Sequence, residues 1–295
     1  MNRYDNHDYR LISKIMGSLG HSCMRCGTEL QGSFCSNCGE KRIENEDKKL
    51  NHFFEEAISS VFVADGKFFK TIKLLLTNPG ELTKSFVIGI RKKYLSPLQL
   101  FFFANLIYFI FPFISTFNTS LDVQLNNLPY SNSIRPVVES YLQESQRSMK
   151  SFTLEFEGVS SSNGKLLLIV LVLLQGLFLK LLFWKRKNLF LVDFLAGSAY
   201  FYGFYILFVL VLLPGVIMLF GDIIGVSINS FFNELTLSII FLLVIITYMY
   251  FLIKKAYDTS TIGSIWRSIL LGAYIIPSFV IYRYILFWVT YWMVT

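Results

Sequence analysis

Four cysteines near the start of the chain carry its clearest chemical signal. They stand in two motifs of the same form, Cys23-Met-Arg-Cys26-Gly and Cys35-Ser-Asn-Cys38-Gly. A Cys-x-x-Cys pair bends the backbone so that two sulfurs reach one ion, and zinc prefers four tetrahedral ligands, often thiolates. The glycine after each pair allows turn conformations that leave backbone amides free to bond the sulfurs. We therefore predict a zinc ribbon whose ligands are Cys23, Cys26, Cys35 and Cys38.

The predicted Zn²⁺ is structural, because four protein ligands leave no open position for water or substrate. Two paired motifs in a reducing compartment favour metal thiolates over disulfides. A redox dithiol, a rubredoxin-like iron site and an iron–sulfur cluster are the alternatives for the same residues. A module this small builds little core, so the metal is expected to supply much of its folding energy.

The remainder of the chain has the composition of a membrane protein. Of its 295 residues, 54% are hydrophobic and 16% are charged, whereas a soluble domain carries about 25% charged residues. We expect a polar head followed by a transmembrane domain at residues 98–295. The head is expected to divide into a flexible lead at 1–20, the zinc ribbon at 21–40, and amphipathic cytosolic or interfacial helices at 41–97.

Apolar runs of about 20 residues are long enough to cross the hydrocarbon core as helices. Their number predicts an all-α membrane protein with about five transmembrane helices and an outer loop at residues 118–165. Pro214–Gly215 predicts a kink in the third helix. The predicted spans are residues 98–117, 166–184, 194–220, 235–253 and 269–287.

Basic residues set the predicted orientation. They cluster at Arg91–Lys93 before the first span, at Lys185–Lys187 after the second, and at Lys254 and Lys255 after the fourth. Cytosolic loops carry an excess of Lys and Arg, and the start of the chain has no apolar stretch typical of a secretory signal. We therefore expect a cytosolic N-terminus and, with five spans, a C-terminus on the outer side.

A few polar residues interrupt the predicted spans, and such residues are functional candidates. Arg283, in the fifth span, is expected to reach the outer interface, to pair with Asp222 or Glu234, or to bind a lipid phosphate. Asn105 and Gln175 lie in the first and second spans, where side-chain amides more often join helices than bind a substrate. These five residues form a candidate polar site in the membrane.

Three segments of the sequence together resemble a known family. The first reads Cys-x-x-Cys-Gly-Thr-Glu-Leu-x-Gly-x-Phe-Cys-x-x-Cys-Gly-Glu from Cys23, the second Asp-Gly-Lys-Phe-Phe-Lys-Thr-Ile-Lys-Leu-Leu-Leu-Thr-Asn-Pro-Gly from Asp65, and the third Gly-Ile-Arg-Lys-Lys-Tyr-Leu-Ser-Pro from Gly89. Over about residues 22–115 the chain resembles a bacterial family of uncharacterised multi-pass membrane proteins with an N-terminal four-cysteine zinc ribbon. The resemblance implies a bacterial inner membrane and brings no activity. A histidine expected in that family early in the third span is absent from residues 191–204.

No catalytic constellation accompanies these features. The chain has no Gly-x-Ser-x-Gly, no P-loop and no His-Glu-x-x-His, and its three histidines all lie in the head. The pattern favours a non-enzymatic adaptor, scaffold or assembly factor over the alternative, a transporter or channel subunit for a small molecule, ion or lipid. An enzyme acting on lipid is least favoured.

The expected partners follow from the same features. They are the lipid bilayer, a protein docked at the zinc ribbon, and a second copy of the chain. The net charge is +7. The basic residues that produce it lie mainly in the head and beside apolar runs, so nucleic acid is not favoured as a partner.

Overall fold

The computed structural model describes the chain in five stretches, and within them the fold is all-α, as predicted. The cysteine head contains only two isolated antiparallel bridges, Ser22 to Glu29 and Phe34 to Lys41. The predicted lead at 1–20 lies outside the described residues. Those residues are 22–42, 66–112, 117, 119–216 and 234–295.

Three helices follow the cysteine head, which is described at residues 22–42. They are α3 (Lys67–Thr77), α4 (Pro79–Val87) and α5 (Pro97–Ile110). Pro79 and Pro97 each stand in the first turn of their helix, where the fixed φ of proline suits the helix and its missing N–H is not needed. Before α5 the Ser96 and Gln99 side chains accept hydrogen bonds from each other's backbone N–H groups. This capping box starts α5 directly after the basic cluster.

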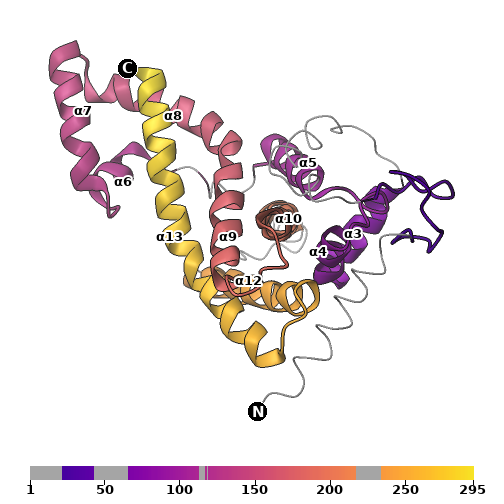
Figure 1. Cartoon of the computed structure of the whole chain (residues 1–295). Helices are drawn as coiled ribbons and strands as arrows, with labels where there is room; N and C mark the ends of the chain where they lie inside the picture. Colours follow the sequence, from indigo (N-terminus) through magenta and orange to yellow (C-terminus); the bar gives the residue numbers. More distant parts are fainter. Residues whose placement is uncertain (1–21, 43–65, 113–116, 118, 217–233) are drawn as a thin grey trace.

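The predicted outer loop at 118–165 is helical. It contains α6 (Leu121–Asn126), α7 (Ser131–Ser145) and most of α8 (Met149–Leu166). In Figure 1 these helices lie together at one end of the molecule, beside the C-terminal end of α13 (Thr261–Val294). They share a separate hydrophobic cluster with α13, and we call them the α6–α8 unit. The cluster's buried members are Leu121, Leu125, Ile134, Val138, Phe152, Phe156, Phe287 and Val294.

A 48° bend separates α8 from α9 (Leu168–Leu182). Helix ends leave carbonyl groups without intrahelical partners, and in an apolar setting each of them needs another donor. Two neighbouring helices supply the donors here. The Asn105 side-chain amide of α5 donates to the Lys165 carbonyl at 2.8 Å, and the Tyr282 hydroxyl of α13 donates to the Gly164 carbonyl. The bend is therefore a built feature of the fold.

α10 (Leu191–Phe204) is the central helix. Figure 1 shows it end-on among α9, α5, α4 and α12 (Glu234–Ala256), and every residue from Val192 to Phe204 is buried. Small residues at Ala196, Gly197, Ser198, Ala199 and Gly203 let the surrounding helices approach closely, as is usual where helices pack in membranes.

A π-helical stretch, η2 (Tyr205–Leu212), continues α10 and leads to residue 216. The Leu213 N–H group donates to the Phe208 carbonyl, five residues back. The departure from regular α-helix therefore comes directly before the predicted kink at Pro214–Gly215. A wider turn at this point is compatible with proline, which has no N–H group to donate.

Three described helices are long and apolar enough to cross a membrane: Leu191–Val216, Ile239–Ala256 and Thr261–Val294. The bent α8–α9 pair would be a fourth if it is one span. The described residues therefore give three or four candidate spans and do not clearly give the predicted five. In the described part of the first predicted span, 98–117, the helix is the 14-residue α5, which is about 21 Å long against about 30 Å of hydrocarbon.

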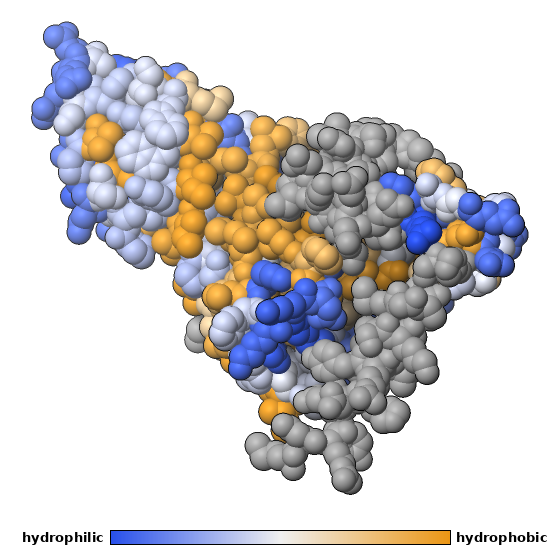
Figure 2. Space-filling view, viewed as in Figure 1, coloured by the Kyte–Doolittle hydropathy of each residue, from blue (hydrophilic) through white to orange (hydrophobic). Residues whose placement is uncertain are grey.

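The boundaries of the last span also differ from the prediction. α13 has 34 residues, so it extends well beyond the predicted 269–287. The helices do not form one parallel bundle, because α9 and α13 run across the view in which α10 is end-on (Figure 1). Figure 2 shows hydrophobic residues gathered in a band across the middle of the molecule, and a more polar surface at the end that carries α7. Composition and surface together are those of a membrane protein.

Candidate metal centre and its attachment to the body

The structure brings the four predicted ligands together. The sulfur atoms of Cys23, Cys26, Cys35 and Cys38 all lie within 4.8 Å of one another. The Cys23–Cys38 and Cys26–Cys35 sulfur pairs are each 3.5 Å apart. Zinc–sulfur bonds of about 2.3 Å in a tetrahedron place sulfurs about 3.8 Å apart. The cluster is consistent with zinc, although its geometry does not identify the metal.

Two tight turns with the same backbone bonds build the cluster. The Cys23 N–H donates to the Thr28 carbonyl at 2.7 Å, and the Gly27 N–H donates to the Cys23 carbonyl at 2.8 Å. In the second turn, the N–H groups of Cys35 and Gly39 make the equivalent bonds. Gly27 has a φ of 75° and Gly39 a φ of 67°, in the left-handed region that glycine adopts most readily. The predicted turn conformation of these glycines is confirmed.

Hydrogen bonds around Cys26 favour its thiolate form. The Asn37 side-chain amide donates to the Thr28 hydroxyl oxygen at 3.2 Å, and that hydroxyl lies 3.2 Å from the Cys26 sulfur. Because the Thr28 oxygen already accepts a bond, its proton is available to the sulfur. The Thr28 side chain and backbone lower the pKa of Cys26 to about 6. Thr28 and Asn37 therefore position and activate a ligand, which cysteine spacing alone did not indicate.

The thiols do not ionise alike without a metal. The pKa of Cys35 is lowered, chiefly by the Cys38 backbone. The Glu40 amide also lowers the pKa of Cys38, but desolvation and the other thiols outweigh it and raise that pKa to about 12. Sulfurs this close resist carrying four negative charges. A bound divalent cation removes that conflict, so the donor set fits a metal.

Glu40 attaches the cysteine head to the rest of the protein. Its side chain is only 3% exposed, and its Oε1 accepts hydrogen bonds from the backbone N–H groups of Arg91 at 3.1 Å and Lys92 at 3.0 Å. Its other carboxylate oxygen lies 3.8 Å from the Arg25 guanidinium. The two N–H donors and the nearby cation offset much of the cost of burying the carboxylate, while Oε2 has no hydrogen-bond partner among the described residues. We call this contact the Glu40 clasp.

Lys92 adds two further contacts to the Glu40 clasp. Its ammonium group donates to the Gly39 carbonyl and lies 5.6 Å from the centre of the Phe34 ring. The sequence indicated only that the basic cluster before α5 is an orientation signal. In the structure this cluster also holds the cysteine head in place. The sign of this contact in the sequence is the acidic residue Glu40, which comes directly after the second Cys-x-x-Cys-Gly.

Three of the five candidate polar side chains of the membrane domain are described, and each has its own neighbours. Asn105 caps the α8–α9 bend, as expected for a residue that joins helices. Gln175 is buried in α9, with its side-chain nitrogen 3.6 Å from the Met249 sulfur. Arg283 lies near Tyr130, where α13 meets the α6–α8 unit; burial raises the pKa of Tyr130, and the charge of Arg283 partly offsets that rise. Asp222 and the Glu234 side chain lie outside the described residues, so their pairing with Arg283 stays a prediction.

Residues 65–109 match the model of a family described as "Protein of unknown function (DUF3667)". The described part of this segment holds α3, α4 and α5, including the basic cluster that seats the head. A search of curated proteins found no match, and neither did a search of solved structures. Over these residues the chain is similar to an uncharacterised family, and the similarity brings no activity with it.

Proposed function

We propose that this chain is a non-enzymatic adaptor or scaffold in a bacterial inner membrane, with a zinc-stabilised head that docks a cytosolic protein. The observation that carries the proposal is the Glu40 clasp. It fixes a four-thiolate cluster to the backbone directly before α5. A closed thiolate site has no position for a substrate. A small surface held rigid by a metal and attached to a membrane body is suited to protein docking.

The proposed orientation places the head in the cytosol. Support comes from the basic segments after α9 and α12, which meet at one end of the molecule. The Arg186 guanidinium donates to the carbonyls of Tyr257 and Asp258, and Lys84 lies 3.0 Å from the Asp258 carboxylate. A basic end is typical of the cytosolic side. In this proposed multi-pass arrangement the chain crosses the membrane within the predicted first span at residues 98–117, so the α6–α8 unit and the C-terminus lie outside.

Affinity purification of the full-length protein tests the docking role. A cytosolic partner is expected to co-purify with the wild type and to be lost from the double variant Cys35→Ser/Cys38→Ser, which removes two metal ligands. Glu40→Ala should also lose the partner while it keeps the metal. Glu29→Ala is the matched control, because Glu29 is an exposed acidic residue of the same head. A partner retained at wild-type level by the cysteine variant would refute the docking role.

A reporter fused after Thr295 tests the orientation separately. A reporter that functions only outside the cytosol is expected to be active at this position, and one that functions only in the cytosol is expected to be inactive. A cytosolic reporter signal would refute the topology without affecting the docking test.

A further inference from the structure

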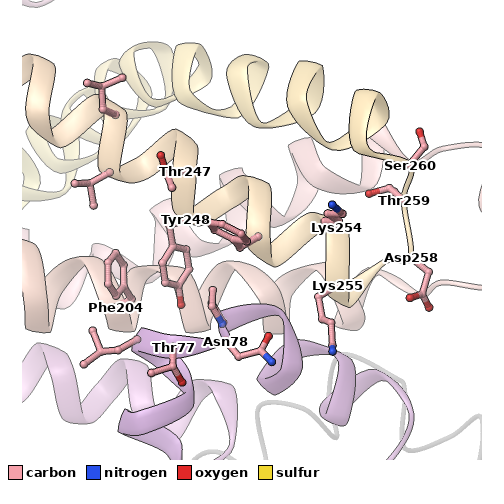
Figure 3. A pocket seen from close by; sticks show the side chains of 15 residues that line it. Thr77, Asn78, Phe204, Thr247, Tyr248, Lys254, Lys255, Asp258, Thr259 and Ser260 are labelled. Atoms are coloured by element: carbon pink, nitrogen blue, oxygen red, sulfur yellow. The ribbon is translucent and has the colours of Figure 1, made fainter.

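A pocket of about 1050 Å³ lies between the junction of α3 with α4 and the C-terminal half of α12. Figure 3 shows it bounded by Thr77 and Asn78 on one side and by Thr247 and Lys254 on the other. α4 and α12 are in close contact beside it, because a Cβ atom on Gly80 would lie 2.8 Å from the Phe251 carbonyl oxygen. The pocket is therefore held between helices that are fixed relative to each other.

One part of the pocket is apolar and open to the surroundings. Leu76, Leu243 and Phe251 line it and are 50%, 58% and 54% exposed. These side chains lie on or beside α12, one of the helices apolar enough to cross a membrane. From Leu243 to Lys255 that helix is about 18 Å long, close to the roughly 15 Å of hydrocarbon in one leaflet. The apolar part has the length and the surroundings of a lipid chain.

The floor of the pocket carries a buried polar atom. The rings of Phe204 and Tyr248 stack there, with centroids 4.0 Å apart. The Tyr248 hydroxyl is buried and has no hydrogen-bond partner among the described residues. Figure 3 shows this side chain extending from α12 towards Thr77 and Asn78. A buried hydroxyl without a partner is uncommon in native proteins, so an occupant with an acceptor oxygen would satisfy it.

The other end of the pocket is polar and carries a surplus of positive charge. Its lining includes Lys254, Lys255 and Asp258. Lys255 pairs with Glu81 at 3.4 Å, and Asp258 pairs with Lys84 at 3.0 Å. Lys254 donates only to the neutral Tyr250 hydroxyl among the described groups. Its charge is therefore not offset by a carboxylate, and it favours an anion at this end.

We propose that this pocket binds one anionic phospholipid of the surrounding membrane. An acyl chain lies along Leu243 and Phe251, an ester oxygen accepts from Tyr248, and the phosphate lies at Asn78 and Lys254. The attraction of about 1 kcal/mol between one lysine and an anionic surface corresponds to a roughly fivefold preference. The inference does not rest on the docking role of the head, and each can fail without the other.

Native mass spectrometry of the delipidated full-length protein tests this assignment. The probes are dioleoyl phosphatidylglycerol and dioleoyl phosphatidylcholine, which share acyl chains and differ in head-group charge. One phosphatidylglycerol should be retained, with about fivefold higher affinity than phosphatidylcholine. Lys254→Gln should abolish the preference. Lys187→Gln should keep it, because Lys187 is an exposed lysine that does not line the pocket.

A second pair of variants tests the apolar part. Thr247 is exposed and lines the pocket. Thr247→Trp should therefore fill the pocket and lower the affinity for both lipids at least tenfold. Ile239→Trp, at an exposed position of α12 outside the pocket, should bind both as the wild type does. Lys254→Gln alters an exposed side chain and keeps the test decisive if Thr247→Trp does not fold.

Three results would overturn the proposal. The first is equal affinity of the wild type for the two lipids. The second is lipid binding by a folded Thr247→Trp variant that matches Ile239→Trp. The third is stabilisation of the lipid-free protein by inorganic phosphate that depends on Lys254, because the pocket would then be a site for a soluble anion.

Discussion

A methyl group on Gly80 would lie 2.4 Å from the Cβ atom of Lys255, so α4 and α12 meet without space for a side chain. We predict that Gly80→Ala forces these helices apart and destabilises the protein by about 1–3 kcal/mol, as overpacking does. Thermal unfolding in detergent would show a lower midpoint. Gly158→Ala is the matched control within α8, because its Cβ atom would meet nothing within 4 Å. That change should raise stability by about 0.5–1 kcal/mol, and equal effects of both changes would contradict the close contact.

The Glu40 clasp predicts a change at a distance from the metal. Glu40→Ala leaves the backbone N–H groups of Arg91 and Lys92 without their acceptor, at a cost of about 1–3 kcal/mol. Hydrogen exchange at these two amides should therefore accelerate by about 5- to 150-fold. Zinc content should remain at the wild-type level, because every thiolate is retained. Unchanged exchange at both amides would show that the head is not seated by this carboxylate.

Zinc retention should depend on pH in a direction that follows from Cys26. Its pKa is lowered from 9.0 to about 6 in the folded head without metal. A lowered pKa contributes stability that is complete above pH 9.0 and is lost as the pH falls through about 6. A bound cation lowers the pKa further, so zinc release should begin only below this range. A colorimetric chelator would detect it, and full release at pH 7 would contradict the predicted site.

Two side-chain amides, those of Asn105 and Gln175, should respond oppositely to the same substitution. Asn105→Leu leaves the Lys165 carbonyl without its donor at the α8–α9 bend and should cost about 1–3 kcal/mol. The Gln175 side-chain oxygen is buried with no hydrogen-bond partner among the described residues, so Gln175→Leu should be neutral or stabilising. Thermal unfolding of the two variants side by side checks this. Marked destabilisation by Gln175→Leu would point to a contact that the described residues do not show.

The cysteine cluster was predictable because its ligands are close in sequence. Four sulfurs separated by short turns meet wherever the remainder of the chain lies. The Glu40 clasp joins positions about 50 residues apart, and no local pattern specifies that pairing. The same holds for Asn105, whose amide was recognised as a helix contact although the carbonyl it caps was not.

Hydropathy located the apolar segments but did not determine what surrounds them. A helix packed by protein and a helix packed by lipid have similar compositions, so α10 was predicted as a span like any other. Its many small residues were the sign that other helices surround it. The helices at 118–165 were predicted as an outer loop because the segment is polar and carries mixed charges between two apolar spans. Their apolar residues pack on α13, a partner far away in sequence.

The two turns of the cysteine head are related by internal symmetry. A shift of 12 positions carries Cys23 to Cys35, Cys26 to Cys38 and Gly27 to Gly39, and the same backbone hydrogen bonds recur in both copies. The symmetry is broken one position later, where Thr28 faces a ligand sulfur and Glu40 faces the loop before α5. A symmetric cysteine head could bind the loop before α5 in either of two orientations related by a half-turn. The carboxylate of Glu40, where the first turn has the hydroxyl of Thr28, favours one of them.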